Sequence, residues 1–368
     1  MKIPFVNLKA QYAEIKTEID DAIHNVIEDT AFIRGKFVEK FEEDYSKAYG
    51  VKNVISCGNG TDAIYISLKA LGIGKGDEVI TTASSWISTS ETISQTGAKV
   101  VFVDIDPNHY VIDIDKIENS ITKNTKAIIP VHLYGHPVNM TKILEIAKKY
   151  NLQVIEDCAQ AHFATWNGRN VGTFGVAGTF SFYPGKNLGA YGDAGCIISD
   201  DDDFASKARM YANHGALKKH FHDIEGINSR MDGIQASILS VKLKYIEEWT
   251  SLRQKNAKLY DDLFSNNPHI IRPITHENAS HVYHLYVIRT SDRESLINFL
   301  KNKNISTAIH YPTPLPFLRA YDYLKYNEND FEVAFNQQKE ILSIPMFPEL
   351  SSQEIKYVVD SINQFLRI

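Results

Sequence analysis

Short runs rich in β-branched residues alternate with stretches of helical character through the first half of this chain. The clearest runs are Asn53 to Cys57, Glu78 to Thr82, Lys99 to Val103, Ala127 to Val131 and Gln153 to Glu156. Each has the length and composition of a strand. Because strands separated by helices pair in parallel, with helices on both faces of the sheet, the alternation predicts an α/β fold around a mostly parallel sheet.

The flanking segments predict further elements. Two helical segments come first, around Tyr12 to Glu28 and Phe37 to Tyr49. The apolar runs Thr179 to Tyr183 and Gly195 to Ser199 are expected to form neighbouring strands. Beyond Asp232 we predict a long helix, because apolar residues step by three or four and share one face. These residues are Ile238, Val241, Tyr245, Trp249 and Leu252.

The length of the chain predicts two domains, since 368 residues exceed one ordinary core. We expect a large domain over residues 1–245 and a smaller α+β domain over residues 246–368, bridged by the long helix. The smaller domain reads as strand, helix, strand and two helices. The corresponding segments are Tyr283 to Thr290, Arg293 to Lys301, Thr307 to His310 and a region that ends at Phe365.

Composition excludes several classes of protein. The net charge of -6 disfavours a duplex DNA binder, and no apolar stretch approaches the roughly 18 residues of a membrane span. Met1 to Leu8 lack the features of a secretory signal, so a cytoplasmic protein without a membrane or nucleic-acid partner is expected. Cys57, Cys158 and Cys196 are widely spaced, which predicts neither disulfides nor a metal site.

A glycine-rich segment joins the first predicted strand to a helix that begins near Gly60. The start of a helix exposes unpaired N–H groups and the positive end of the helix dipole, which favours a bound phosphate. The hydroxyl of Thr61 would add a donor. A tight turn without a ligand explains the same residues, so this motif needs support from others.

Asp157 follows the apolar pair Val154-Ile155 at the carboxyl end of a predicted strand. Open α/β sheets bind their ligands at this edge. A carboxylate there can pair with a pyridinium nitrogen and keep it protonated. Gln160 and His162 follow closely, which favours a site over the alternative of a helix cap or a solvent-facing carboxylate.

Lys186 has the most informative surroundings in the chain. It follows Phe182-Tyr183-Pro184 and has Gly185 and Gly189 beside it. Most lysines are solvated surface charges. Packing against aromatic rings would remove water from the ammonium and lower its pKa toward the neutral amine that a Schiff base requires.

The chain resembles the sugar aminotransferases of the DegT/DnrJ/EryC1/StrS group, which share the fold type I, aspartate aminotransferase-like scaffold. The resemblance runs from Pro4 to Pro312 and keeps the order and spacing of the family's motifs. The motifs between these ends are Gly76 to Ile80, Val131 to Gly135, Glu156 to His162, Ser181 to Gly192 and Gly226 to Asp232.

The resemblance implies pyridoxal 5'-phosphate as the cofactor. Lys186 is then expected to bind it covalently, Asp157 to pair with the ring nitrogen and Gln160 to approach the ring hydroxyl. Trp86 would stack on the ring, although a role as a core aromatic explains it as well. The residues expected to hold the phosphate are Gly60, Thr61 and Ser181.

The resemblance also implies partners. Asn228 is expected to reach the phosphate of the other subunit, which requires a homodimer with shared active sites; the alternative is a turn residue before the long helix. L-Glutamate would donate the amino group and a nucleotide-linked keto sugar would accept it. Lys186 separates this chain from relatives that carry a histidine there and dehydrate sugars.

The segment from Ile309 to Leu315 resembles members that act on dTDP-linked 3-keto-6-deoxyhexoses for surface glycans such as lipopolysaccharide or for glycosylated metabolites. His310 and Tyr311 are the candidate sugar contacts. An enzyme for a dTDP- or UDP-linked 4-keto sugar is the alternative, and a regulatory relative without turnover is a third hypothesis. Pro316-Phe317 and His136 depart from the family pattern in ways that could alter the sugar pocket.

Overall fold

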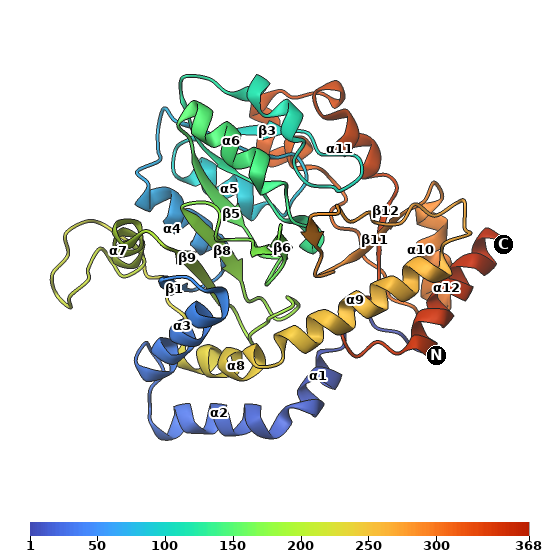
Figure 1. Cartoon of the computed structure of the whole chain (residues 1–368), viewed down its shortest axis with the longest axis horizontal. Helices are drawn as coiled ribbons and strands as arrows, with labels where there is room; N and C mark the ends of the chain where they lie inside the picture. Colours follow the sequence, from blue (N-terminus) through green and yellow to red (C-terminus); the bar gives the residue numbers. More distant parts are fainter. Residues whose placement is uncertain (368) are drawn as a thin grey trace.

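The computed structural model describes residues 1–367 (Figure 1). A seven-stranded sheet forms its centre, and β9 alone runs against the direction of the other strands. The strand order is β1 (Asn53–Cys57), β9 (Gly195–Ser199), β8 (Ala177–Ser181), β5 (Gln153–Asp157), β4 (Thr125–Ile129), β2 (Glu78–Thr82) and β3 (Lys99–Val103). The predicted α/β fold with a mixed, mostly parallel sheet is confirmed.

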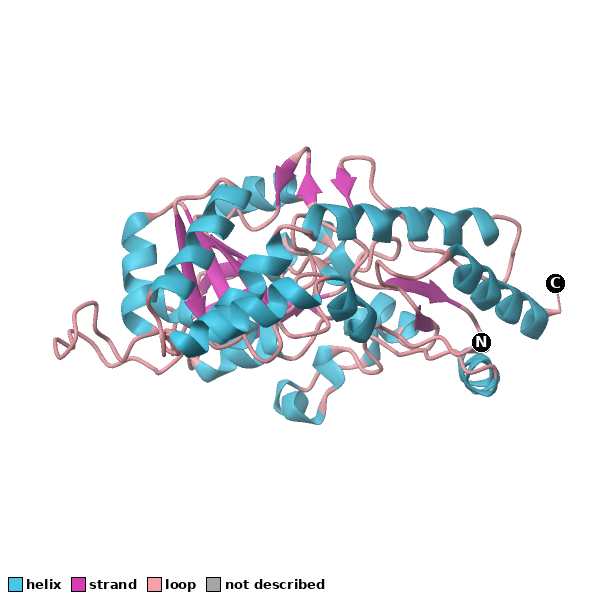
Figure 2. Ribbon diagram, turned by 90° about the horizontal axis from the view of Figure 1, so that it is seen from below, coloured by secondary structure: helices cyan, strands magenta, loops and turns pink. Residues whose placement is uncertain are grey.

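Both faces of the sheet are buried, which explains why its strands read as continuous apolar runs rather than as alternating ones. Successive side chains of one strand pack into the hydrophobic clusters on opposite faces of the sheet, as those of Ile128 and Ile129 do. The helices of one face are α4 (Gly60–Ala70), α5 (Ser88–Gln95) and α7 (Asp202–Tyr211). Those of the other are α3 (Lys36–Tyr49), α6 (Met140–Tyr150) and α8 (Gly233–Leu243). Figure 2 shows helices on both sides of the strands.

Two strands begin and end two residues before their predicted bounds. β4 ends at Ile129 because Pro130 has no N–H to donate to the ladder, although Val131 still bridges Asp157. β8 begins at Ala177-Gly178, whose small side chains gave no strand signal. Gly178 is required there, because an added Cβ would lie 2.4 Å from the backbone of Gly172.

Both long predicted helices are divided. The first is split at Ile15 into α1 (Leu8–Glu14) and α2 (Lys16–Glu28). The second is split at Lys244 and Tyr245 into α8 and α9 (Ile246–Leu263). Apolar residues from both halves still share one cluster with α2; of the predicted face, Ile238, Val241, Tyr245 and Trp249 belong to it and Leu252 does not. In Figure 1, α9 runs from α8 toward α10 and α12. The break lies at the predicted domain boundary, which itself stays a prediction.

The C-terminal part packs α9, α10 (Arg293–Asn302) and α12 (Ser352–Leu366) around a two-stranded antiparallel sheet. Its strands are β11 (Tyr286–Arg289) and β12 (Ile341–Ile344). The predicted strand Thr307 to His310 was wrong: only Ala308 bridges Ser343. β12 takes the place beside β11, in a segment interpreted as helical; the short α11 (Glu332–Gln337) precedes it.

A small three-stranded sheet completes the structure. It pairs β10 (Ala279–Ser280) with β6 (Thr165–Trp166), which also pairs with β7 (Arg169–Asn170). Residues 279–280 of the C-terminal part are thereby hydrogen-bonded to the segment that follows β5. Within residues 1–367 we find no helix with both the length and the hydropathy of a membrane span.

Candidate active site

Asp157 ends β5 and is buried, with 5% of its surface exposed. Its Oδ2 accepts a hydrogen bond from the Thr89 hydroxyl at 2.7 Å, and its Oδ1 accepts one from the Ala159 N–H at 3.1 Å. The Thr89 hydroxyl lies 3.0 Å from that of Ser85. The carboxylate is therefore held in one orientation at the carboxyl edge of the sheet, as the strand pattern predicted.

Lys186 lies in the loop after β8, where its N–H donates to the Tyr183 carbonyl at 2.8 Å. Burial lowers the pKa of its ammonium to about 8, while the negative charge of Asp157 acts in the opposite direction. The two predicted catalytic side chains are thus close enough to interact electrostatically. A lysine with this pKa supplies neutral amine near physiological pH, which a nucleophile requires.

The residues predicted to bind phosphate lie around the start of α4. An added Cβ on Gly60 would lie 2.6 Å from the Cβ of Ser181, so the first turn of α4 contacts Ser181 directly. The Thr61 hydroxyl lies 2.6 Å from that of Ser88. The Asn59 side chain caps the helix by accepting from the N–H of Asp62 at 2.8 Å. The arrangement can bind an anion at the helix start.

Gln160 and Trp86 meet at Tyr311. The Gln160 amide donates to the Tyr311 hydroxyl at 3.0 Å and accepts from the N–H of Tyr134 at 2.7 Å. The rings of Trp86 and Tyr311 are 5.6 Å apart. Trp86 is 58% exposed, so the structure does not make it a core aromatic and leaves part of its surface uncovered.

His310 lies on the same side of the site. Its Nδ1 is 2.8 Å from the Ser343 hydroxyl, its ring stacks on Phe5 at 5.6 Å and its carbonyl accepts from the Tyr134 hydroxyl. Burial, followed by the charge of Lys186, lowers the pKa of His310 to about 4. The imidazole is therefore neutral at pH 7.

Two polar residues near Lys186 were missed in the sequence. His284 Nδ1 lies 3.1 Å from Asn187 Oδ1, and the Asn187 amide donates to the Val282 carbonyl at 3.1 Å. Burial, and then the charge of Lys186, holds the pKa of His284 well below its usual range. Asn187 follows Lys186 directly and could have been noted, but His284 was placed inside a predicted strand.

Asn228 is exposed and forms an isolated bridge with Asn213. Its neighbour Ser229 accepts from the N–H of Gly58 at 2.9 Å and donates to Asp62 at 2.6 Å. Asn228 is thereby held beside the start of α4 in its own chain. Its reach to a second subunit stays a prediction.

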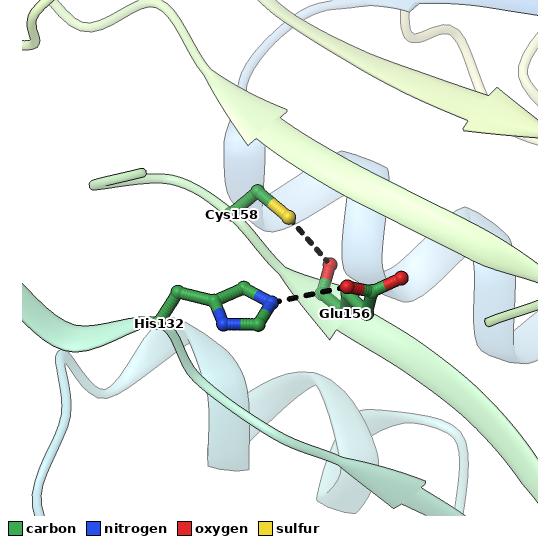
Figure 3. Close-up of side chains that lie close together, drawn as sticks. All are labelled: His132, Glu156 and Cys158. Carbon is green, nitrogen blue, oxygen red and sulfur yellow. Dashed lines mark hydrogen bonds and ion pairs between the residues drawn. The ribbon is translucent and has the colours of Figure 1, made fainter. Parts of the chain in front are cut away.

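His132, Glu156 and Cys158 form a buried cluster next to Asp157 (Figure 3). His132 Nδ1 accepts from the N–H of Val138 at 3.0 Å, so its Nε2 carries the proton and donates to Glu156 at 3.1 Å. Three further N–H groups donate to this carboxylate, those of Gly172, Phe174 and Gly175. Burial raises the pKa of the Cys158 thiol well above its usual range. Both ring nitrogens of His132 and both carboxylate oxygens of Glu156 already form hydrogen bonds within the protein. We therefore interpret the cluster as an anchor for β5 rather than as a metal site.

A cavity of about 810 Å³ opens at the opposite edge of the sheet. Residues that line it precede or begin the parallel strands, for example Asp77, Thr125 and Gln153. Ligands of open α/β sheets bind at the carboxyl ends of strands. We therefore assign the site to the edge that holds Asp157.

The residues at this edge fit pyridoxal 5'-phosphate. Asp157 offers a carboxylate for a protonated ring nitrogen, and Lys186 offers an amine with a lowered pKa for an aldehyde. The start of α4 packs so closely on Ser181 that only glycine fits, which brings backbone N–H groups to where a phosphate would bind. Trp86 offers an uncovered aromatic surface for a planar ring.

Comparison with protein families gives one match that covers most of the chain. The model of the DegT/DnrJ/EryC1/StrS aminotransferase family matches residues 13–363. A "Pleiotropic regulatory protein" of Geobacillus stearothermophilus is 45% identical over 369 residues, which cover 100% of this chain and 99% of that protein. A "dTDP-3-amino-3,6-dideoxy-alpha-D-galactopyranose transaminase" of Aneurinibacillus thermoaerophilus is 41% identical, with 99% of each chain covered.

A solved structure agrees with this match. The crystal structure of Streptomyces venezuelae DesV in complex with a ketimine intermediate superimposes with a TM-score of 0.97. The two sequences are 35% identical, and the superposition covers 100% of this chain and 99% of the DesV chain.

Proposed function

Because the chain belongs to the DegT/DnrJ/EryC1/StrS aminotransferase family, we propose that it transfers an amino group from L-glutamate to a dTDP-linked 3-keto-6-deoxyhexose. The product is a dTDP-3-amino-3,6-dideoxyhexose, for a surface glycan such as lipopolysaccharide or for a glycosylated metabolite. The cofactor is pyridoxal 5'-phosphate. The observation that carries the proposal is that Asp157, at the end of β5, lies close enough for its charge to act on the Lys186 amine.

The cofactor supplies an aldehyde for the amino group and a ring that draws electrons from the reacting carbon. Lys186 would hold its aldehyde covalently, and the free amine would be placed to move a proton to or from the reacting carbon of the donor or acceptor. Asp157 keeps the ring nitrogen protonated. Gln160 would orient the ring hydroxyl and Trp86 would cover one face of the ring. The N–H groups around Gly60 would bind the phosphate together with the hydroxyls of Thr61 and Ser181.

We assign the sugar contacts to His310 and Tyr311. Both belong to the C-terminal part, yet Tyr311 bonds to Gln160 and His310 responds to the charge of Lys186. A neutral imidazole and a phenol hydroxyl can each form hydrogen bonds with the hydroxyl groups of a sugar. We also propose that the active unit is a homodimer in which Asn228 contacts the phosphate of the other subunit.

Product analysis tests this substrate assignment. In separate reactions, the enzyme and glutamate are mixed with one acceptor each. The acceptors are the 3-keto and 4-keto 6-deoxyhexoses linked to dTDP and the same two sugars linked to UDP. NMR of the products should show amination at C3 of the dTDP sugar and little reaction with the others. Amination at C4, or a preference for UDP, would replace the proposed substrate with the alternative and leave the aminotransferase assignment intact.

A regulatory protein without turnover is the alternative of a different class, and the name of the Geobacillus relative raises it. The site supports the enzyme, since a protein that does not react has no chemical need for Lys186 beside Asp157. Purified protein with bound cofactor should show a visible absorbance band that glutamate bleaches. A band that persists in excess glutamate would favour the regulatory protein.

A further inference from the structure

α8 presents two polar side chains to the loop that carries Lys186. Lys242, with 0% of its surface exposed, donates to the Gly189 carbonyl at 2.7 Å, and its ammonium lies 4.2 Å from the centre of the Tyr191 ring. Two helical turns earlier, Gln235 accepts from the N–H of Tyr191 at 2.9 Å. The loop is therefore held by α8 immediately after Lys186.

Lys242 is costly to bury. The other fully buried positions of α8 carry apolar or small residues. Burial lowers the pKa of Lys242 to about 8, and Glu349 offsets this only in part. Burying an ammonium costs free energy unless the charge is paired, so the lysine needs an explanation other than overall stability.

The loop of residues 183–191 is folded tightly, so a displacement of Gly189 is passed on to Lys186. An added Cβ on Gly189 would lie 2.4 Å from the Pro184 carbonyl oxygen. The N–H of Ala190 donates to the Phe182 carbonyl at 2.8 Å, which joins the two ends of the loop. Asn187 is held by a separate contact, because its amide donates to the Val282 carbonyl. Gly189 thus cannot move far without moving Lys186.

We propose that Lys242 is a positioning residue that fixes the loop of residues 183–191, and through it the amine of Lys186, for amino transfer. Gln235 supports the same loop at Tyr191. The proposal deepens the proposed function and rests on the role assigned there to Lys186. It adds a residue that acts through the Gly189 carbonyl and not by contact with cofactor or substrate.

Lys242→Met tests the proposal, because methionine has an unbranched side chain of nearly the same length and lacks the donor. Hydrogen exchange, followed by mass spectrometry with and without cofactor, should show faster exchange of the amides of Lys186, Ala190 and Tyr191. The kcat should fall about 100-fold, as expected for a reacting group misplaced by about 1 Å, while the KM for the sugar changes less than about twofold. The thermal unfolding midpoint should change by only a few degrees, because loss of the hydrogen bond to Gly189 destabilises the fold while removal of a buried ammonium stabilises it.

Three variants complete the experiment. Lys242→Gln keeps a neutral donor and should recover part of the kcat. Gln235→Ala removes the contact with Tyr191 and should loosen the same amides, which keeps the test usable if Lys242→Met does not fold. Lys244→Met is the matched control, since Lys244 lies on the same helix end, is exposed and bonds to Glu18. It should change none of these measurements.

The outcomes separate this proposal from the proposed function. Unchanged exchange in residues 183–191, or faster exchange throughout the protein with a matching fall in the unfolding midpoint, overturns the positioning role. If Lys186 were not the cofactor lysine, the loop would still loosen in Lys242→Met, but reduction of the wild-type holoenzyme would leave Lys186 unlabelled.

Discussion

At the scale of single residues, burial decides which groups near Lys186 carry charge. Burial lowers the pKa of Lys186 to about 8 and that of His310 to about 4. The site therefore combines a lysine that reaches its neutral form near physiological pH with an imidazole that is already neutral. The sequence indicated the lysine through its flanking residues, but it could not show how many protein atoms surround each group.

Asp157→Asn should separate the two effects of the carboxylate. Because the charge of Asp157 raises the pKa of Lys186, its removal should lower that pKa further below about 8. Amino transfer should slow by orders of magnitude, since an amide cannot keep the ring nitrogen protonated. The pKa is measured from the pH dependence of Lys186 acetylation in cofactor-free protein, and the transfer rate from cofactor absorbance.

Thr89→Val is the matched control for this variant. It removes one hydrogen bond to Asp157 and keeps the charge. Its effect on both measurements should be much smaller. Near-normal transfer in Asp157→Asn would remove Asp157 from the mechanism.

At the scale of elements, the central sheet followed from the sequence more closely than the rest. β1, β2, β3 and β9 have the predicted bounds, because β-branched runs buried on both faces leave a strong signal. β12 was missed because its partner β11 lies more than 50 residues earlier, and pairing at that distance leaves no local pattern. The split between α8 and α9 was missed because their shared apolar face continues across the break.

The candidate site was predictable where one element supplies several residues, as at the end of β5. Asn187 and His284 were missed because their partnership is formed only when the C-terminal part packs on the loop of Lys186. Lys242 gave no signal at all, since a lysine in a helix is ordinarily exposed. Contacts between distant elements are what the sequence could not supply.

Gly60→Ala tests the contact between α4 and β8. The added Cβ would lie 2.6 Å from that of Ser181, so the helix start must move. We expect the affinity for pyridoxal 5'-phosphate to fall by about tenfold or more, because the displaced N–H groups at the start of α4 no longer meet the phosphate. Helix propensity cannot explain such a loss, since alanine favours a helix more than glycine does. Titration of cofactor fluorescence measures it.

Gly74→Ala is the control, because a Cβ there would meet only the Thr96 carbonyl at 3.5 Å, an ordinary contact. It should bind the cofactor as the wild type does. Wild-type affinity in Gly60→Ala would show that the start of α4 does not hold the phosphate.

At the scale of the whole molecule, buried histidines should make the fold sensitive to acid. Burial lowers the pKa of His136 and of His162 to about 3, and holds that of His281 well below its usual range. An ordinary histidine in the unfolded chain titrates near pH 6.5, so below that pH the unfolded state binds more protons. Stability should fall as the pH drops from about 6.5 toward 3 and should not depend on these groups above 6.5.

His136→Gln isolates one contribution. His136 is buried, and its Nε2 accepts from the N–H of His276 at 3.1 Å, which a glutamine oxygen can replace. Between pH 7.5 and pH 5, the free energy of unfolding should fall by about 2 kcal/mol less in the variant than in the wild type. This value corresponds to the roughly 1.5 pH units between pH 5 and the pKa of an unfolded histidine. Urea unfolding at pH 7.5 and pH 5 measures this. An equal loss in both proteins would contradict the prediction.

The proposed dimer makes a prediction for mixed subunits. Lys186→Ala and Asn228→Asp should each be nearly inactive, the second because a carboxylate repels the phosphate. If Asn228 serves the other subunit, one site of a mixed dimer collects both defects and the other has neither. Equal mixing should therefore restore about a quarter of wild-type activity. Mixed dimers without activity would show that Asn228 serves its own subunit.

The most direct test of the central claim is where the cofactor is attached. Borohydride reduction of the purified holoenzyme, followed by peptide mass mapping, should place the pyridoxyl group on Lys186. The structure offers a specific competitor, because burial also lowers the pKa of Lys242 to about 8. A label on Lys186 alone is the predicted result; a label on Lys242 or any other lysine, or none in protein that binds the cofactor, would contradict the account.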